Sequence, residues 1–248
     1  MPARASAFAG FDDFVPRRTT PLRALLCILL VVALASLATA FGGRWLVHAA
    51  APMFHTESRQ VREIVVGSSV LRVPENVIRE PRMRRDGAQE RLDLYFRWPQ
   101  MEGYTPDARA AFNHAGGSRS IIYATIAPRR LAHDMSDRLE PIYRHLVAPE
   151  EREAADGLTI RPFREEAGFA GEVLVVGERP PERPFVARCL TRDTAAHSLA
   201  PCEREVHFGD DLSLVYRFPR EILNEWRILD EKILAGAGEY LTARSTGS

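Results

Sequence analysis

Apolar residues are distributed along the chain in two ways, as one unbroken run near the N-terminus and as many short runs after it. Residues 24–41 read ALLCILLVVALASLATAF, which is 18 consecutive residues without a charged side chain. As an α-helix this run would be about 27 Å long, close to the ~30 Å hydrocarbon core of a bilayer. The pattern predicts a transmembrane helix over 24–43, preceded by a short disordered leader over 1–23 and followed by a spacer over 44–60.

Arginines flank the apolar run unequally. Arg17, Arg18 and Arg23 precede it, whereas Arg44 alone lies close behind it. Because basic residues are retained on the cytoplasmic side, this bias predicts a cytoplasmic N-terminus and a periplasmic remainder. The alternative is a cleaved signal peptide, since residues 38–40 (Ala-Thr-Ala) resemble a cleavage site. The apolar run is longer than the usual h-region of about 7–15 residues, so we expect a retained signal anchor in the inner membrane.

From about residue 61 the short runs are rich in β-branched and aromatic residues, which is typical of strands. Within 92–97, apolar side chains alternate with Asp93, Tyr95 and Arg97. Such alternation predicts one buried and one wet face, as in antiparallel sheets. We expect an α+β domain with a mainly antiparallel sheet over 61–240, and a frayed tail over 241–248. The predicted strands are Glu63–Val66, Val70–Val73, Leu92–Trp98, Ile121–Ile126, Leu158–Phe163, Glu172–Val176, Phe185–Leu190, Glu203–Phe208 and Leu212–Phe218.

Three helices are predicted within this domain. The first begins at Thr105-Pro106-Asp107, an N-cap hydroxyl followed by proline at the first helical position, and Gly116-Gly117 ends it. The second covers Ser136–Val147 and contains Pro141, which a helix tolerates only near its first turn. The third follows Pro219, where apolar residues at helical spacing predict one stripe facing a core. That stripe consists of Ile222, Trp226, Leu229 and Ile233.

Two segments of the chain resemble each other. Residues 92–99 read LDLYFRWP and residues 212–219 read LSLVYRFP, and each follows a Val-Val-Gly sequence, at 65–67 and 175–177. One explanation is a two-fold pseudo-repeat that places two related strand units in one sheet or in two packed lobes. The other is chance recurrence of strands ending in arginine, an aromatic residue and proline. The sequence leaves both open.

The charges of the chain balance but are unevenly placed. The 248 residues include 33 basic and 33 acidic side chains, and this zero net charge argues against a nucleic-acid partner. Residues 1–54 carry five arginines and two aspartates, whereas residues 55–248 carry 28 basic and 31 acidic groups. A basic leader and a mildly acidic exported domain agree with the predicted orientation.

The three cysteines are too few for a dense disulfide scaffold or a four-thiolate zinc site. Cys189 and Cys202 flank a polar segment between two predicted strands, and we expect them to form a disulfide in an oxidising compartment. Two unpaired thiols are the alternative. Cys27 lies within the apolar run and is read as a buried apolar side chain. Since neither CxxC nor HxxxH spacing is present, no metal or cofactor is expected.

No recognised catalytic motif is present. Ser68 and Ser69 follow a predicted strand end and are the nearest candidates for a nucleophile. His207 lies close to Asp210 and Asp211, and imidazole with carboxylates suits acid–base chemistry or metal binding. The favoured interpretation is structural in both cases, a Gly-Ser turn and a Gly-Asp-Asp turn between strands.

An arginine-rich segment is the most site-like surface feature. It contains Arg79, Arg82, Arg84, Arg85 and Arg91, and guanidinium groups bind lipid headgroups, phosphates or acidic partners. Glu80, Asp86 and Glu90 are interleaved, which favours an ordinary solvated loop.

The sequence GSSVLRVPENVIREPRMRRDGAQERLDLYFRWPQMEGYT, with the later SLVYRFPREILNEWRILD, resembles uncharacterised membrane-anchored proteins of bacterial envelopes. The resemblance covers roughly residues 60–240 and implies location only. The leading hypothesis is a non-catalytic interaction protein, an accessory or assembly factor of an envelope complex. The alternatives are an exported hydrolase using Ser68, Ser69 or the region 207–211, and a binding module for a lipid or small ligand.

Overall fold

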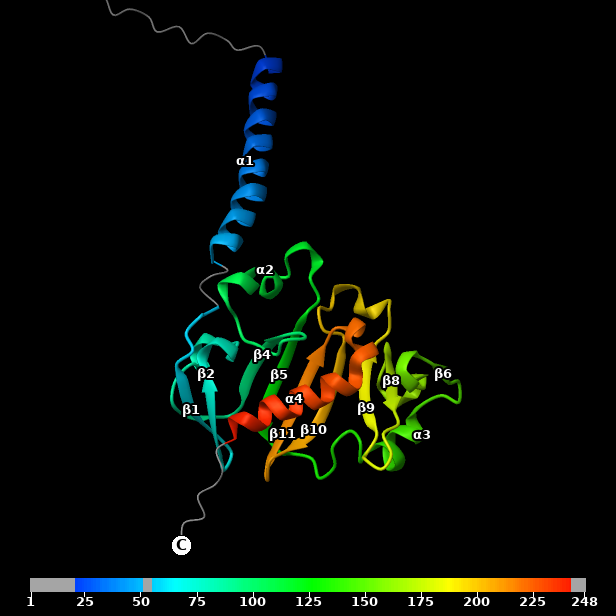
Figure 1. Ribbon diagram of the computed structural model, residues 1–248. Coiled ribbons are helices and arrows are strands. Elements are labelled where there is room, and N and C mark those ends of the chain that lie inside the picture. Colours follow the sequence, from blue (N-terminus) through cyan, green and yellow to red (C-terminus); the bar gives the residue numbers. More distant parts are fainter. Residues whose placement is uncertain (1–20, 51–54, 242–248) are drawn as a thin grey trace, which may run out of the picture. The chain divides into compact units, whose positions relative to one another are not determined.

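The structure is a computed structural model that describes residues 21–50 and 55–241 (Figure 1). It divides into two units, Met1–Ala50 and Ala51–Ser248. The leader expected over 1–23 and the tail expected over 241–248 fall almost entirely outside the described residues. Part of the spacer expected over 44–60 does so as well.

The described part of the first unit is the helix α1 (Pro21–Ala50), which includes the predicted span over 24–43. Its leucine- and alanine-rich sequence favours an uninterrupted helix. Apolar side chains such as Leu30 and Val31 are exposed. Among the described residues, no helix combines the length and the apolar character that crossing a membrane requires. The membrane span stays a prediction.

An eight-stranded sheet forms the centre of the second unit (Figure 1). Every neighbouring pair of strands in it is antiparallel. The α+β class with a mainly antiparallel sheet is therefore confirmed. In spatial order the strands are β4 (Leu92–Arg97), β5 (Ile121–Pro128), β11 (Leu212–Phe218), β10 (Cys202–Phe208), β9 (Phe185–Leu190), β8 (Glu172–Gly177), β7 (Leu158–Pro162) and β6 (Arg152–Glu153).

A smaller sheet is formed by β1 (Val61–Val66), β2 (Ser69–Pro74) and β3 (Gly87–Gln89). β1 pairs antiparallel with β2 and parallel with β3. All nine predicted strands are present within two residues of their expected ends. The sequence missed β3 and β6, which are too short to show alternation.

Helix α4 (Trp226–Tyr240) covers one face of the large sheet, crossing β11, β10 and β9 (Figure 1). The predicted stripe is confirmed, because Ile222, Trp226, Leu229 and Ile233 are all buried in the main core. Burying such side chains contributes about 1.5–3 kcal/mol each. The first part of the expected helix is instead the 3₁₀ segment η10 (Arg220–Glu225).

The opposite face of the sheet is covered in two places. One cluster lies under the π-helical turn η6 (Leu139–Tyr143) and the short helix α3 (Arg144–Leu146). This replaces the regular helix expected over Ser136–Val147, because Pro141 has no amide hydrogen and Tyr143 donates to the carbonyl of Arg138 five residues back.

The second cluster lies beside α2 (Arg109–Phe112). It corrects the expectation that one face of residues 92–97 is wet. Tyr95 is buried against Phe112, with ring centroids 4.8 Å apart, and Asp93 is buried where it accepts a hydrogen bond from Thr125. The remaining 3₁₀ segments are η2 (Glu75–Val77), η3 (Pro81–Met83), η4 (Pro106–Ala108), η5 (Ala115–Gly117), η7 (Ala155–Gly157), η8 (Glu165–Ala167) and η9 (Thr194–His197).

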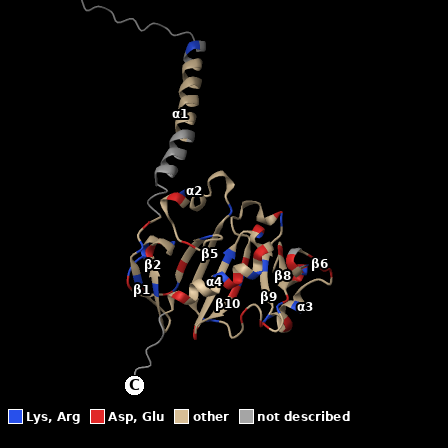
Figure 2. Ribbon diagram, in the orientation of Figure 1, with Lys and Arg blue, Asp and Glu red and all other residues tan. Residues whose placement is uncertain are grey.

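The two similar segments lie on either side of the same strand. β4 and β11 both pair antiparallel with β5, so they run in the same direction. The two Val-Val-Gly sequences end strands of different sheets, β1 in the small one and β8 in the large one. The pseudo-repeat stays a prediction. Basic and acidic residues are interspersed over the strands, in keeping with the balanced charge (Figure 2).

A close approach between α4 and β8 requires a glycine. A Cβ atom at Gly177 would lie 2.7 Å from Cζ2 of Trp226 and 2.9 Å from Cδ2 of Leu158. The indole ring is fully buried, packs on Phe185 with ring centroids 5.0 Å apart, and carries the Arg227 guanidinium 4.2 Å above its centroid. The ring can lie this close to the sheet because position 177 has no side chain.

A buried ionic network joins α4 to the sheet. Nε of Arg204 on β10 donates to Oδ1 of Asp230 on α4 at 2.9 Å. The same carboxylate accepts a hydrogen bond from the Tyr216 hydroxyl at 2.6 Å and another from Nη2 of Arg179 at 3.0 Å. Arg204 also donates to the Ser136 hydroxyl oxygen at 3.1 Å. Burial by itself would raise the pKa of Asp230, but the charge of Arg204 and the hydrogen bonds lower it below the ordinary value.

Asp230→Asn is expected to destabilise the domain by about 3–5 kcal/mol at pH 7, because it leaves the Arg204 guanidinium buried without its counter-charge. The pKa of Asp230 is lower in the folded than in the unfolded state, so its stabilisation is present above the unfolded value and is lost as the pH falls through the folded value. The difference from wild type should therefore shrink below about pH 4. Denaturant unfolding followed by tryptophan fluorescence measures both effects.

Glu231→Gln is the matched control, because it removes the same charge from the neighbouring, exposed position of α4. It should change the free energy of unfolding by less than about 0.5 kcal/mol. Equal effects of the two substitutions would contradict the role assigned to Asp230.

Candidate functional site

The predicted serine candidates lie at a turn that is bonded to an aspartate. Oδ2 of Asp211 accepts hydrogen bonds from the backbone amide of Ser68, at 3.0 Å, and from its hydroxyl. Oδ1 accepts from the Ser69 hydroxyl at 2.9 Å. Gly67 precedes them with a φ of +60°, which glycine adopts without strain. Asp211 therefore ties the β1–β2 turn of the small sheet to the β10–β11 turn of the large one.

His207 belongs to a different group of side chains. Its ring nitrogen lies within 4.8 Å of carboxylate oxygens of Asp134 and Asp137. The Arg183 guanidinium contacts both acids, at 3.1 Å and 2.9 Å, and so supplies a positive charge at this place. Burial would raise the pKa of Asp134, but an amide hydrogen bond from Asp137, the charge of Arg183 and an amide hydrogen bond from His207 lower it.

The candidate catalytic residues predicted from the sequence thus lie in two separate clusters. Ser68, Ser69 and Asp211 come together, whereas His207 joins Asp134. Asp210 lies with Asp211 in the turn between β10 and β11. The hydrolase hypothesis stays a prediction.

The arginine-rich segment has partly structural roles. Nε of Arg84 donates to the carbonyl of Ile78 at 3.0 Å, and Nη2 donates to that of Arg79 at 3.2 Å. The Arg79 guanidinium lies over the ring of Tyr123, 5.7 Å from its centroid. Arg82 and Arg85 are exposed. Binding at this segment also stays a prediction.

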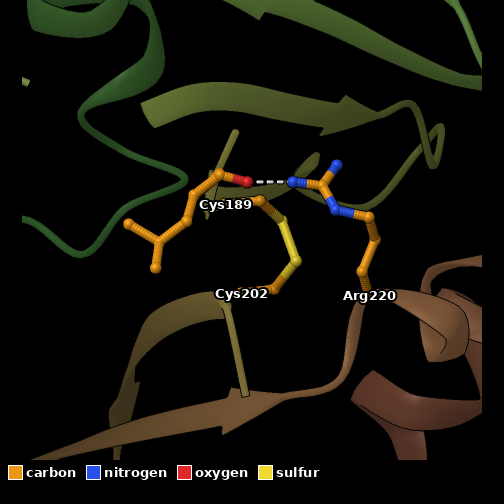
Figure 3. The surroundings of a disulfide bond; sticks show 4 residues. Cys189, Cys202 and Arg220 are labelled. Atoms are coloured by element: carbon orange, nitrogen blue, oxygen red, sulfur yellow. Dashed lines mark hydrogen bonds between the residues drawn. A yellow bond between two sulfur atoms is a disulfide. The ribbon is translucent and has the colours of Figure 1, made fainter. Parts of the chain in front are cut away.

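The disulfide between Cys189 and Cys202 is present, with an S–S distance of 2.05 Å, as the sequence predicted. The two residues face each other on the paired strands β9 and β10 and are almost completely buried. Figure 3 shows the Arg220 side chain extending past the disulfide toward the backbone, where its Nη2 donates to the carbonyl oxygen of Leu190. The disulfide and this arginine together fix one end of the β9–β10 connection.

A cavity of about 620 Å³ opens beside this end of the sheet. We call it the arginine pocket. Its walls come from β6 and β7, from the connection closed by the disulfide, and from η10. Its lining residues are Arg119, Arg152, Ala154, Leu158, Ile160, Arg192, Ala195, Ala196, Pro201, Arg220, Glu221, Leu223 and Asn224.

The electrostatics of the arginine pocket are strongly positive. Four arginines and a single glutamate line it, and that glutamate, Glu221, is paired with Arg119 at 3.8 Å. Burial and then the nearby charges of Arg192 and Arg152 lower the pKa of Arg220. Among the described residues no ion pair engages Arg152, Arg192 or Arg220. The pocket therefore concentrates positive charge that the surrounding protein leaves largely unneutralised.

Sequence reasoning missed this pocket entirely. Arg152, Arg192 and Arg220 lie on β6, in the connection after β9 and at the start of η10, so no local spacing links them. Two signals in the sequence bear on their proximity. One is the expected disulfide, which brings the region around Arg192 to β10. The other is Pro219, which places Arg220 directly after the neighbouring strand β11.

No protein-family model and no curated protein matches the sequence. Two solved structures are similar in three dimensions. An immunity protein of the Stenotrophomonas maltophilia type IV secretion system has a TM-score of 0.51 at 14% identity, covering 76% of this chain and 96% of that chain. The iron-regulated outer membrane lipoprotein FrpD of Neisseria meningitidis has a TM-score of 0.43 at 8% identity, covering 75% and 98%. The first likeness shows a shared fold and nothing about activity.

Removing the disulfide should destabilise the domain. For a loop of 13 residues the chain-entropy model gives about 3 kcal/mol, which corresponds to a fall in Tm of roughly 6–12 °C for a domain of this size. The double substitution C189A/C202A should show this fall in thermal unfolding followed by circular dichroism. Cys27→Ser is the control, because Cys27 is a free cysteine, and it should leave the Tm of the domain unchanged. An unchanged Tm in the double variant would contradict the prediction.

Proposed function

We propose that this chain is a membrane-anchored protein whose folded domain lies in the periplasm and acts without catalysis, as an interaction or assembly factor of an envelope complex. The proposal has two parts, a location and a mode of action. Separate observations support them.

The buried disulfide is the observation that carries the location. A disulfide between Cys189 and Cys202 persists in an oxidising compartment and is rare in the cytoplasm. It joins the paired strands β9 and β10 of the large sheet and therefore contributes to the stability of the folded domain. A periplasmic domain is the simplest way to meet the requirement for an oxidising compartment.

The anchor is supported by the first unit of the chain. α1 contains the 18-residue uncharged run, and the side chains of that run which the structure describes are exposed. The three arginines that precede the run favour a cytoplasmic N-terminus. We therefore propose that residues 24–43 hold the protein in the inner membrane.

A non-catalytic role is supported by the bonds of the candidate residues. Asp211 accepts hydrogen bonds from the Ser68 and Ser69 hydroxyls and thereby joins two sheets. Asp134, beside His207, is bonded to Arg183 and to backbone amides. These carboxylates are engaged in hydrogen bonds and an ion pair that hold segments of the fold together. An immunity protein of a secretion system has a similar fold, and we propose a protein-binding role in the envelope for this chain.

The location predicts a specific outcome for reporter fusions. A phosphatase that is active only in the periplasm, fused after residue 248, should be active, and a reporter that is active only in the cytoplasm should be silent there. The phosphatase fusion lacking residues 24–43 is the control and should lose its activity. An N-terminal tag that remains in the membrane fraction supports a retained anchor. Activity of the cytoplasmic reporter would overturn the orientation.

The mode of action predicts a stable partner. The full chain, crosslinked in living cells and purified from membranes in mild detergent, should elute from size exclusion in a stoichiometric complex with one defined envelope protein. Reciprocal purification of that protein should recover this chain. A chain that elutes alone after crosslinking would contradict the interaction role.

A further inference from the structure

The arginine pocket has the dimensions of a ligand site. Its volume of about 620 Å³ lies within the roughly 300–1,000 Å³ typical of small-molecule pockets. Its walls combine polar and apolar groups. Leu158, Ile160, Ala195 and Leu223 supply apolar surface, and these four are buried or nearly so. A ligand of this site would therefore have both a charged part and an apolar part.

Three guanidinium groups define the charge that such a ligand must carry. Arg119 is offset by Glu221, which leaves Arg152, Arg192 and Arg220 as the groups that no ion pair engages among the described residues. Guanidinium groups have low hydration and present N–H groups in a planar fork that matches phosphate oxygens bidentately. A carboxylate offers these groups two oxygens and a single charge, whereas a phosphate monoester offers three terminal oxygens and a charge of about −1.5 to −2. A phosphate group has enough oxygens and charge.

The arginines are carried by parts of the fold that are held in place. Arg220 donates to the carbonyl of Leu190 beside the disulfide (Figure 3). Arg192 lies within the connection that the disulfide closes, and this connection is bonded to Gly171 through the Thr191 amide, at 2.7 Å, and the Thr194 hydroxyl, at 2.8 Å. Arg152 is paired in β6 with Ile160 of β7. Such support lowers the entropic cost of bringing three like charges to one ligand.

We propose that the arginine pocket binds a phosphate-bearing ligand, with the phosphate held by Arg152, Arg192 and Arg220 and an adjoining apolar group packed on Leu158, Ile160 and Leu223. The site requires neither the membrane anchor nor the protein partner proposed above. The phosphate belongs to a small phosphate ester or to a phospholipid headgroup, since the same guanidinium chemistry recognises both.

Calorimetric titration of the full chain in detergent tests the proposal. The probes are phenyl phosphate, benzoate, inorganic phosphate and glycerophosphoglycerol, a phospholipid headgroup without acyl chains. Phenyl phosphate should bind at least about tenfold more tightly than benzoate, because a phosphate engages more arginine donors. It should also bind more tightly than inorganic phosphate, because the ring adds apolar contact. Tight binding of glycerophosphoglycerol identifies a lipid headgroup as the source, and a preference for phenyl phosphate identifies a small ester.

Two variants locate the binding. Arg152→Gln and Arg192→Gln remove exposed arginines whose side chains form no hydrogen bond or ion pair with the described part of the chain, and each should weaken phenyl phosphate binding by about tenfold or more. Arg72→Gln is the matched control, because it removes an exposed arginine from the small sheet, and it should bind as wild type does. An unchanged thermal unfolding curve shows that each variant is folded. Absence of phosphate binding, equal affinity for benzoate, or binding unaffected by both pocket variants would overturn the proposal.

Discussion

The ion pair between Arg204 and Asp230 is the interaction on which the arrangement of the domain depends. Both groups are buried, and an unpaired charge in that position would cost several kcal/mol. Asp230 is satisfied from three directions, by Arg204 on β10, Tyr216 on β11 and Arg179 after β8. Apolar packing alone would tolerate small shifts of a helix on a sheet, whereas these hydrogen bonds fix the position of α4 along its axis.

The position of α4 in turn determines where one wall of the arginine pocket lies. α4 is continuous with η10, whose first residue is Arg220. The disulfide fixes the other wall by joining β9 to β10, and Arg220 bridges the two through the Leu190 carbonyl. Two interactions thus position the walls of the pocket, the ion pair between Arg204 and Asp230 and the disulfide between Cys189 and Cys202. This explains how three arginines that repel one another remain close.

Local patterns predicted most of the strands and the buried stripe of α4, because alternation and helical spacing depend on neighbouring residues alone. They also favoured the pairing of Cys189 with Cys202. They failed where distant segments decide the outcome. Tyr95 is buried because α2, a separate element, covers its side of β4. Arg152, Arg192 and Arg220 lie close together because the fold brings three distant segments of the chain to one place. The burial of Arg204 could have been predicted from the sequence, because it occupies an inward-facing position between Cys202 and Val206 on β10.

The contact between Gly177 and Trp226 limits how this chain can vary. The indole occupies the volume that a side chain at position 177 would need. A larger residue at 177 requires a smaller one at 226 and also a shift of the Leu158 side chain, whose Cδ2 would lie 2.9 Å from the added Cβ. We therefore expect the two positions to vary together, although they lie 49 positions apart in the sequence. In distant relatives with little overall identity, a glycine at the end of one strand matched to a tryptophan at the start of the last helix would mark the same helix-on-sheet packing.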